Sequence, residues 1–226
     1  MSLRRVLRHV LGRVLGPAAL ALSCTLVAGD AAADPAAAQA FVEQRLGQMM
    51  KLVEEGAATP KIHEAIDRMV DYDELAKRTL GKPCPAKAAT CTNHWEALSA
   101  AQQTEVTGLL KQLVEKNVHK NLIKTKNYDI SYRGSKEHGE NLAKVRTEAK
   151  SKASVRDAPL QVDYVVLSAG DKYKAIDIVT EGSSMTKNYY DQFTRMLTTP
   201  AQGFPHLVQK LKDKIAVKEE AAKEGK

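Results

Sequence analysis

The sequence predicts an α+β fold, because two kinds of hydrophobic pattern follow one another along it. Apolar residues recur three and four positions apart from residue 36 to 122, which indicates helices with one buried face. Four segments between residues 128 and 181 then alternate apolar and polar residues, as strands do. Helical spacing returns after Met185. This order is typical of an antiparallel sheet of about four or five strands packed by about six or seven helices.

The N-terminal segment has the layout of a secretory signal peptide. Four arginines form a basic start, residues 14–28 are mostly apolar and small, and Ala31-Ala32-Ala33 supplies a cleavage site. We therefore expect residues 1–33 to be removed and the rest to be exported. An uncleaved membrane anchor is the alternative, but Pro17 interrupts an apolar run that is already short for a bilayer span.

The remaining chain is mildly basic and is long enough for one domain with a hydrophobic core. Of 226 residues 43% are hydrophobic, and 34 Lys and Arg face 27 Asp and Glu. Removal of residues 1–33 takes away four arginines and one aspartate, which leaves 30 against 26, or +4. We expect no nucleic-acid partner, since a binder would concentrate its basic residues in a patch. Residues 217–226 are mostly charged and predict an exposed tail, so the domain should span residues 34–216.

Three helices are expected before the cysteines. Residues 36–55 carry apolar side chains on one face. Pro60 favours the start of a second helix, because the first helical position does not need its missing N–H. Residues 71–81 predict a short third helix, with Gly81 suited to its C-terminal cap.

A long helix should follow from Ser99 to about Leu122. Ser99 and Gln102 form a capping box at its start. Its apolar stripe is broad, and a stripe of that width can be packed core or the wall of a cavity.

The four expected strands cover residues 128–132, 142–150, 158–168 and 171–181. The third places Leu160, Val162, Tyr164 and Val166 on one face. A helix with Met185, Tyr189, Phe193 and Met196 on one face comes next, and a last helix starts near Pro205.

Cys84 and Cys91 are the two cysteines that remain after signal removal. An even count in an exported protein favours a disulfide. Closing so short a loop would stabilise the fold by roughly 2.5 kcal/mol. Free thiols and a zinc site are the alternatives, but zinc needs two more ligands and only His94 is near.

The sequence contains no catalytic motif. Its histidines form no H-E-x-x-H, and it has neither a nucleophile elbow nor a glycine-rich loop before a helix. Asp163 and Asp177 lie in adjacent predicted strands and could pair for acid–base chemistry, although each is more simply a solvent-facing or lysine-paired residue. We expect no catalytic residue, metal or cofactor.

One segment carries a family resemblance. Residues 173–193, YKAIDIVTEGSSMTKNYYDQF, resemble the W-K-V-Y-D-V-x-x-E-G-V-S-L-x-x-N-Y-R-x-Q-F motif of the MlaC family of periplasmic phospholipid shuttles. VDYDELAKRTLG and residues 94–110 match further family segments in order, so that the resemblance covers roughly residues 36–215. Tyr173 stands where the family commonly has Trp, and Tyr190 where it often has Arg.

The resemblance implies a twisted antiparallel sheet packed by helices, with a deep apolar pocket that takes phospholipid acyl chains. It also implies a periplasmic protein of a Gram-negative envelope with two partners, an outer-membrane lipoprotein–porin complex and the MCE-domain ring of an inner-membrane ABC transporter. We expect a monomer. The alternatives are a carrier of hopanoid-like lipids, a small enzyme on a cone-shaped α+β fold, and an adaptor with a filled core.

We expect the implied pocket to be lined from the long helix, the third and fourth strands and the helix after them. Each nominated residue could equally be ordinary core. The nominated residues are Val106, Leu110, Leu113, Val162, Tyr164, Val166, Ile176, Ile178, Met185, Tyr189 and Phe193.

Overall fold

The computed structural model describes residues 33–223 except 86–89, 155 and 171, with side chains up to Ala216. Apart from Ala33, the expected signal peptide lies outside the described residues. The described part has six helices and one five-stranded antiparallel sheet, which confirms the predicted α+β class. The helices are α1 (Pro35–Glu54), α2 (Thr59–Met69), α3 (Tyr72–Thr79), α4 (Ala100–Thr125), α5 (Met185–Thr198) and α6 (Gly203–Lys223). The strands are β1 (Tyr128–Gly139), β2 (Leu142–Ser151), β3 (Leu160–Ala169), β4 (Lys172–Thr180) and β5 (Ser183–Ser184).

The sheet is a simple meander in the order β1-β2-β3-β4-β5, in which every strand pairs with its sequence neighbours. β5 is short and returns along β4 through Glu181 and Gly182, whose φ angles are 49° and 77°. Positive φ at both central residues is the geometry of a tight two-residue hairpin turn. The acidic-glycine junction in the sequence is therefore a turn that reverses the chain at the edge of the sheet and delivers it into α5.

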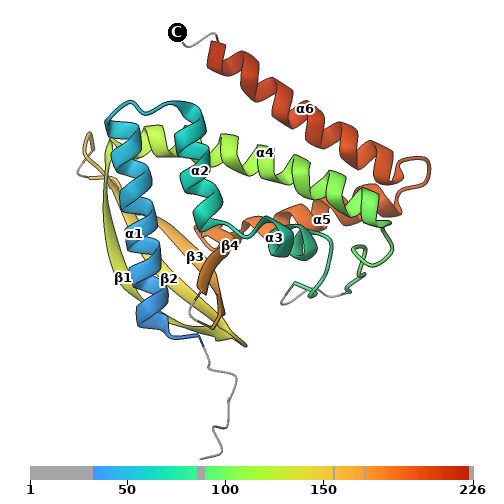
Figure 1. The fold of residues 1–226 in the computed structure, drawn as a ribbon, viewed down its shortest axis with the longest axis horizontal. Coiled ribbons are helices and arrows are strands. Elements are labelled where there is room, and N and C mark those ends of the chain that lie inside the picture. The colour runs from blue at the N-terminus through green and yellow to red at the C-terminus, as the bar shows by residue number, and fades with distance from the viewer. Residues whose placement is uncertain (1–32, 86–89, 155, 171, 224–226) are drawn as a thin grey trace, which may run out of the picture.

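The helices form a layer on one face of the sheet and continue beyond it. Figure 1 shows α1 lying along that face, with α2 beside it and α4 crossing behind the upper ends of both. α6 runs outermost and packs on α4, while α5 contacts α3, α6 and β4. The sheet is thus covered by α1, α2 and the C-terminal half of α4, and the other half of α4 packs among helices. α6 continues to Lys223, through most of the segment that we expected to be a tail.

One hydrophobic cluster joins the helices to the inner face of the sheet, and a small second cluster lies on the other face. The second consists of Val165, Ile176 and Val179. It exists because β4 contains a bulge: Val165 pairs with Asp177 and Val166 with Ala175, which leaves Ile176 as the extra residue. The bulge alters which β4 side chains face the helices, a change that strict alternation does not predict.

Side-chain caps set the helix starts. The predicted capping box of α4 is present, with Ser99 accepting from the Gln102 N–H and the Gln102 side chain accepting from the Ser99 N–H. Asp34 caps α1 in the same way by accepting from the Ala36 N–H at 2.9 Å.

The predicted disulfide between Cys84 and Cys91 is confirmed, with a Cα–Cα distance of 5.8 Å. The residues after it dock on α5. The hydroxyl of Tyr190 accepts from the Thr92 N–H at 2.9 Å, and Nε2 of His94 lies 3.1 Å from the hydroxyl of Thr194. The bridge therefore closes a loop that is held against a helix far along the chain.

Candidate binding cavity

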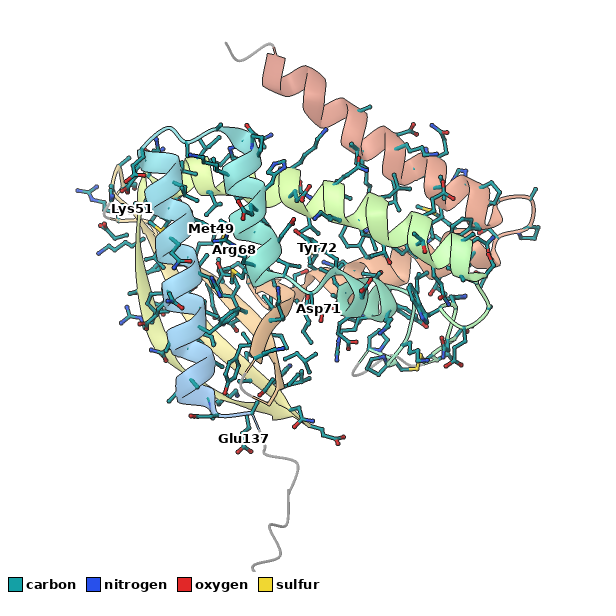
Figure 2. All side chains as sticks on the ribbon, viewed as in Figure 1. Met49, Lys51, Arg68, Asp71, Tyr72 and Glu137 are labelled. Carbon is teal, nitrogen blue, oxygen red and sulfur yellow. A yellow bond between two sulfur atoms is a disulfide. The ribbon has the colours of Figure 1, made fainter. Side chains whose placement is uncertain are left out.

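A cavity of about 400 Å³ lies between the inner face of the sheet and the helices α1, α2 and α4. This volume is within the range of about 300–1,000 Å³ that is usual for small-molecule sites. Figure 2 shows Met49 in the space between α1 and α2, on the side where the cavity lies. The helices and the residue between α2 and α3 line one side: Leu46, Met49, Met50, Ile66, Met69, Val70, Leu75, Val114, Val118, Asn121, Leu122, Lys124, Thr125 and Met185. The strands line the other side: Tyr128, Ile130, Thr147, Ala149, Leu160, Val162, Tyr164, Ala175, Ile176, Asp177, Ile178 and Thr180.

The wall of the cavity is almost free of charge. Of its 26 residues only Lys124 and Asp177 are ionisable at neutral pH. The carboxylate of Asp177 accepts hydrogen bonds from the N–H groups of Ile178 and Thr186 and from the hydroxyl of Ser184, so its charge is used at the start of α5. Such a wall favours a hydrophobic occupant, since a polar one would lose its hydration without new partners.

The mouth of the cavity lies at one end of the sheet. The exposed lining residues are Asn121 and Lys124 near the end of α4, Leu160 at the start of β3 and Thr180 at the end of β4. Because the strands are antiparallel, the start of β1, the end of β2, the start of β3 and the end of β4 meet at this edge. Figure 1 shows this end of the sheet beside the C-terminal end of α4, at the upper left. The cavity thus opens where polar groups reach solvent.

Two tyrosines on the helix-facing side of the sheet stay neutral. Burial raises the pKa of Tyr164, and the nearby Tyr132 adds to the effect. Burial, followed by the charge of Glu43, raises the pKa of Tyr132 to about 12. The sheet face therefore carries no tyrosinate at physiological pH.

Five of the eleven nominated residues line the cavity. They are Val162, Tyr164, Ile176, Ile178 and Met185. Tyr164 and Ile178 are directly paired across β3 and β4, so they form one patch on the sheet face. Ile176 borders the cavity from the bulge and also belongs to the second hydrophobic cluster.

Six nominated residues do not line the cavity. Val106, Leu110 and Leu113 are fully buried, but they lie in the part of α4 before Val114, where the cavity begins. Val166 is fully buried in the main core. The helix stripe and the strand alternation run on without a break, so neither pattern marks where packed core gives way to open space.

Tyr189 and Phe193 pack against each other and toward α6. Their ring centroids are 5.4 Å apart, and the ammonium of Lys214 lies 5.2 Å from the ring of Tyr189. The aromatic pair therefore occupies the junction of α5 with α6. Only Met185, the first residue of α5, reaches the cavity.

Sequence reasoning missed the contribution of α1 and α2. These helices supply Leu46, Met49 and Met50, and Ile66 and Met69. A signal was present, because four of the six methionines in the chain line the cavity. Methionine is unbranched and polarisable, and it is common on surfaces that adapt to varied apolar ligands.

A polar cluster braces α2 against α4 outside the cavity. Asp67 accepts hydrogen bonds from the hydroxyl of Tyr72 at 2.9 Å and from the ammonium of Lys111, which also lies 3.4 Å from Glu115. Nδ1 of His63 is 3.6 Å from Glu115. Figure 2 shows Tyr72 at the start of α3, directly under α4. These contacts hold the α2 wall in place.

The cluster shifts the pKa values of its two carboxyl groups, Glu115 and Asp67, in opposite directions. Burial raises the pKa of Glu115, and the nearby Asp67 raises it further. Burial alone would also raise the pKa of Asp67, but the hydrogen bonds from Lys111 and Tyr72 outweigh it and keep that pKa below its ordinary value.

The two aspartates considered for acid–base chemistry have structural partners. Asp163 is 1% exposed, lies 3.0 Å from the ammonium of Lys144 and accepts from the side chain of Gln161. Asp177 anchors α5, as described above. Among the described residues, no three His, Cys, Asp or Glu side chains gather in a way that could hold a metal ion.

The fold and the cavity together define an α+β protein that encloses an apolar space with a polar mouth. The chain belongs to the MlaC family, whose model, described as MlaC protein, matches residues 36–213. This confirms the resemblance in the sequence.

A solved structure shares the fold. It is the phospholipid-binding protein from Ralstonia solanacearum in complex with a phospholipid, which is 19% identical, with a match that covers 80% of this chain and 98% of that chain at a TM-score of 0.65. No curated protein matches the chain. Over the residues that the structure describes, none of the helices has the length and hydropathy that a membrane crossing needs.

Proposed function

We propose that this protein binds a phospholipid by its acyl chains in the cavity and carries it through the periplasm as a monomer. Its partners would be an outer-membrane lipoprotein–porin complex and the MCE-domain ring of an inner-membrane ABC transporter, as its family membership suggests. The observation that carries the proposal is a cavity of about 400 Å³ whose wall offers one free charge, at the mouth.

The energetics of acyl chains explain why such a carrier is useful. Burial contributes about 0.8 kcal/mol per CH₂, so the burial of two long chains stabilises a lipid in its membrane, relative to water, by more than roughly 20 kcal/mol. A cavity as apolar as the bilayer recovers this free energy for the part of the chains that it encloses, which lowers the cost of extraction. Direction must then come from the partners or from ATP hydrolysis by the transporter.

The mouth suits a polar head group. Lys124 and Asn121 are exposed there, and Lys124 is the one cation in the wall. In this arrangement the acyl chains lie on the methionine-rich helices and the sheet, and the ammonium of Lys124 pairs with the lipid phosphate near solvent. The activity is binding and transfer, without a catalytic step.

The expected cleavage site is compatible with the start of α1. Cleavage after Ala33 would leave Asp34 as the first residue, and Asp34 is the cap of α1. The mature chain would therefore keep every group that begins its first helix.

The test is to extract the purified protein with organic solvent and identify the lipids by mass spectrometry. We expect phospholipid in the native protein and a reduced load in Val162→Trp, because Val162 lines the cavity and the indole would fill part of it. Ile123→Trp is the matched control, since Ile123 is 52% exposed and is not in the wall.

Three results would contradict parts of the proposal. Preparations that contain no lipid would count against the carrier, and a hopanoid-like lipid in place of phospholipid would replace the proposed ligand. An unchanged load in folded Val162→Trp would remove this cavity as the site.

A further inference from the structure

A second hollow, of about 820 Å³, lies between α1, the end of α2 and the start of β4. It shares no lining residue with the first cavity. None of its lining residues is acidic, and four are basic: Arg45, Arg68, Lys172 and Lys174. We call it the basic groove. Figure 2 shows Arg68 at the lower part of α2, on the side of α1.

Arg45 lines this groove and has one donor without a partner. Its Nε is buried and has no hydrogen-bond partner. Its guanidinium lies 5.6 Å from the centre of the Phe41 ring, and Nη1 reaches Gln48 at 3.3 Å. A buried donor without a partner costs free energy, and a carboxylate is the acceptor that binds a guanidinium most strongly.

Lys174 shows how closely the cations are gathered. Its ammonium donates to the backbone carbonyls of Asp67 and Arg68 at 2.9 and 3.1 Å, where it caps the end of α2. Burial lowers the pKa of Lys174; the charge of Arg45 acts in the same direction, and the charges of Asp71 and Asp67 oppose it. Lys174 is therefore occupied by the fold. Arg68 forms an exposed i,i+4 ion pair with Glu64, which contributes little and can exchange for an incoming carboxylate, so Arg45, Arg68 and Lys172 can meet an anion.

The floor of the groove is an open strand edge. β5 covers only the end of β4, and Val70 makes a parallel bridge to Ala175, whose carbonyl accepts from the Asp71 N–H at 3.0 Å. Backbone groups two residues apart on a strand point the same way, so those of Tyr173 also point outward. In the described part of the chain, nothing pairs with Tyr173 on that side.

The geometry points to an acidic, extended segment of a partner protein as the occupant of the basic groove. Its backbone would pair with Tyr173 and continue the line begun by Val70, and its carboxylates would meet Arg45, Arg68 and Lys172. The rings of Phe41 and Tyr173, 6.1 Å apart, would cover one side of it. This proposal does not depend on the lipid ligand.

An extended peptide fits these features better than an anionic membrane does. A lipid surface would meet the exposed lysine and arginine heads, but it would leave the backbone groups of Tyr173 without partners. A strand laid in the groove can supply both a carboxylate and a backbone acceptor.

The test is fluorescence anisotropy with a labelled, end-capped decapeptide that alternates Glu and Val. We expect saturable binding to the purified protein, and about tenfold weaker binding to Arg45→Gln and to Arg68→Gln, the change that follows from loss of one charge-assisted hydrogen bond. Arg133→Gln is the matched control, because Arg133 pairs with Glu148 on β1 and β2, away from the groove. A Gln-Val peptide should not bind, and an N-methylated Glu-Val peptide should bind more weakly than its parent.

Three results would overturn the proposal. Equal binding to the native protein and to both groove variants would mean that the site lies elsewhere. Equal binding of the N-methylated peptide would rule out strand pairing. Phosphatidylglycerol vesicles that bind through Arg45 and Arg68, while the peptide does not, would make the groove a membrane contact.

Discussion

The carboxylate of Asp177 accepts a hydrogen bond from the backbone N–H of Thr186 at 2.9 Å, which fastens the start of α5 to β4. The same side chain accepts from the hydroxyl of Ser184, which itself caps the helix. A negative charge at a helix N-terminus is also favourable for the helix dipole. One residue thus sets where the sheet ends and the next helix begins.

Replacing Asp177 by alanine should destabilise the fold by about 2–4 kcal/mol, because buried donors at the start of α5 would lose their acceptor. Urea unfolding followed by circular dichroism measures the change. Asp191→Ala is the control: Asp191 pairs with Lys187 on the exposed face of α5, and its loss should cost less than about 1 kcal/mol. Equal losses in the two variants would show that Asp177 is not an anchor.

Two glycines should respond in opposite ways to alanine. Gly81 has a φ of 84°, and an added Cβ would lie 2.4 Å from the carbonyl oxygen of Thr92 and 2.9 Å from the ring of Tyr190. Gly81→Ala should therefore cost more than about 2 kcal/mol. Gly47 lies in α1 with nothing within 4 Å of its Cβ position, so Gly47→Ala should stabilise by up to about 1 kcal/mol. Thermal melting of both variants tests the signs, and a stable Gly81→Ala would mean that the loop can move away.

Reduction of the Cys84–Cys91 bridge should cost on the order of 2 kcal/mol and leave lipid binding intact in the folded protein. The reason is that neither cysteine, nor the docked residues Thr92 and His94, lines the cavity. Melting and lipid load of Cys84→Ser/Cys91→Ser measure both effects. Titration of the unreduced, denatured protein should first find no free thiol from this pair. A changed transfer rate without a change in melting would indicate a gate or a docking surface.

Glu115 should make stability fall as the pH rises. Burial and then the nearby Asp67 raise its folded-state pKa. A raised pKa means that its stabilising contribution is complete below the ordinary value of 4.5 and is lost as the pH climbs through the folded-state pKa. Glu115→Gln should remove this loss, so the difference in unfolding free energy between variant and native protein should grow with pH. A constant difference from acid to neutral pH would contradict the assignment.

The sequence by itself determined the fold class, the element order and several local devices. Helical spacing and alternation depend only on which side chains must leave water, and they predicted the helices and the meander. The α4 capping box, the Glu181-Gly182 turn and the Cys84–Cys91 pair are short-range features, so their residues carry the information locally. Family motifs then indicated a pocket, but not which residues line it.

Only the tertiary structure decided where packed core ends and the cavity begins. Leu113 and Val114 are adjacent on one helix, yet only Val114 reaches the cavity, because successive side chains on a helix point about 100° apart and Leu113 packs into the core. Phe193 turned out to belong to the core and Met49 to the cavity wall. A hydrophobic pattern records that a side chain leaves water, and the spacing between packed elements determines whether it meets another side chain or an open space.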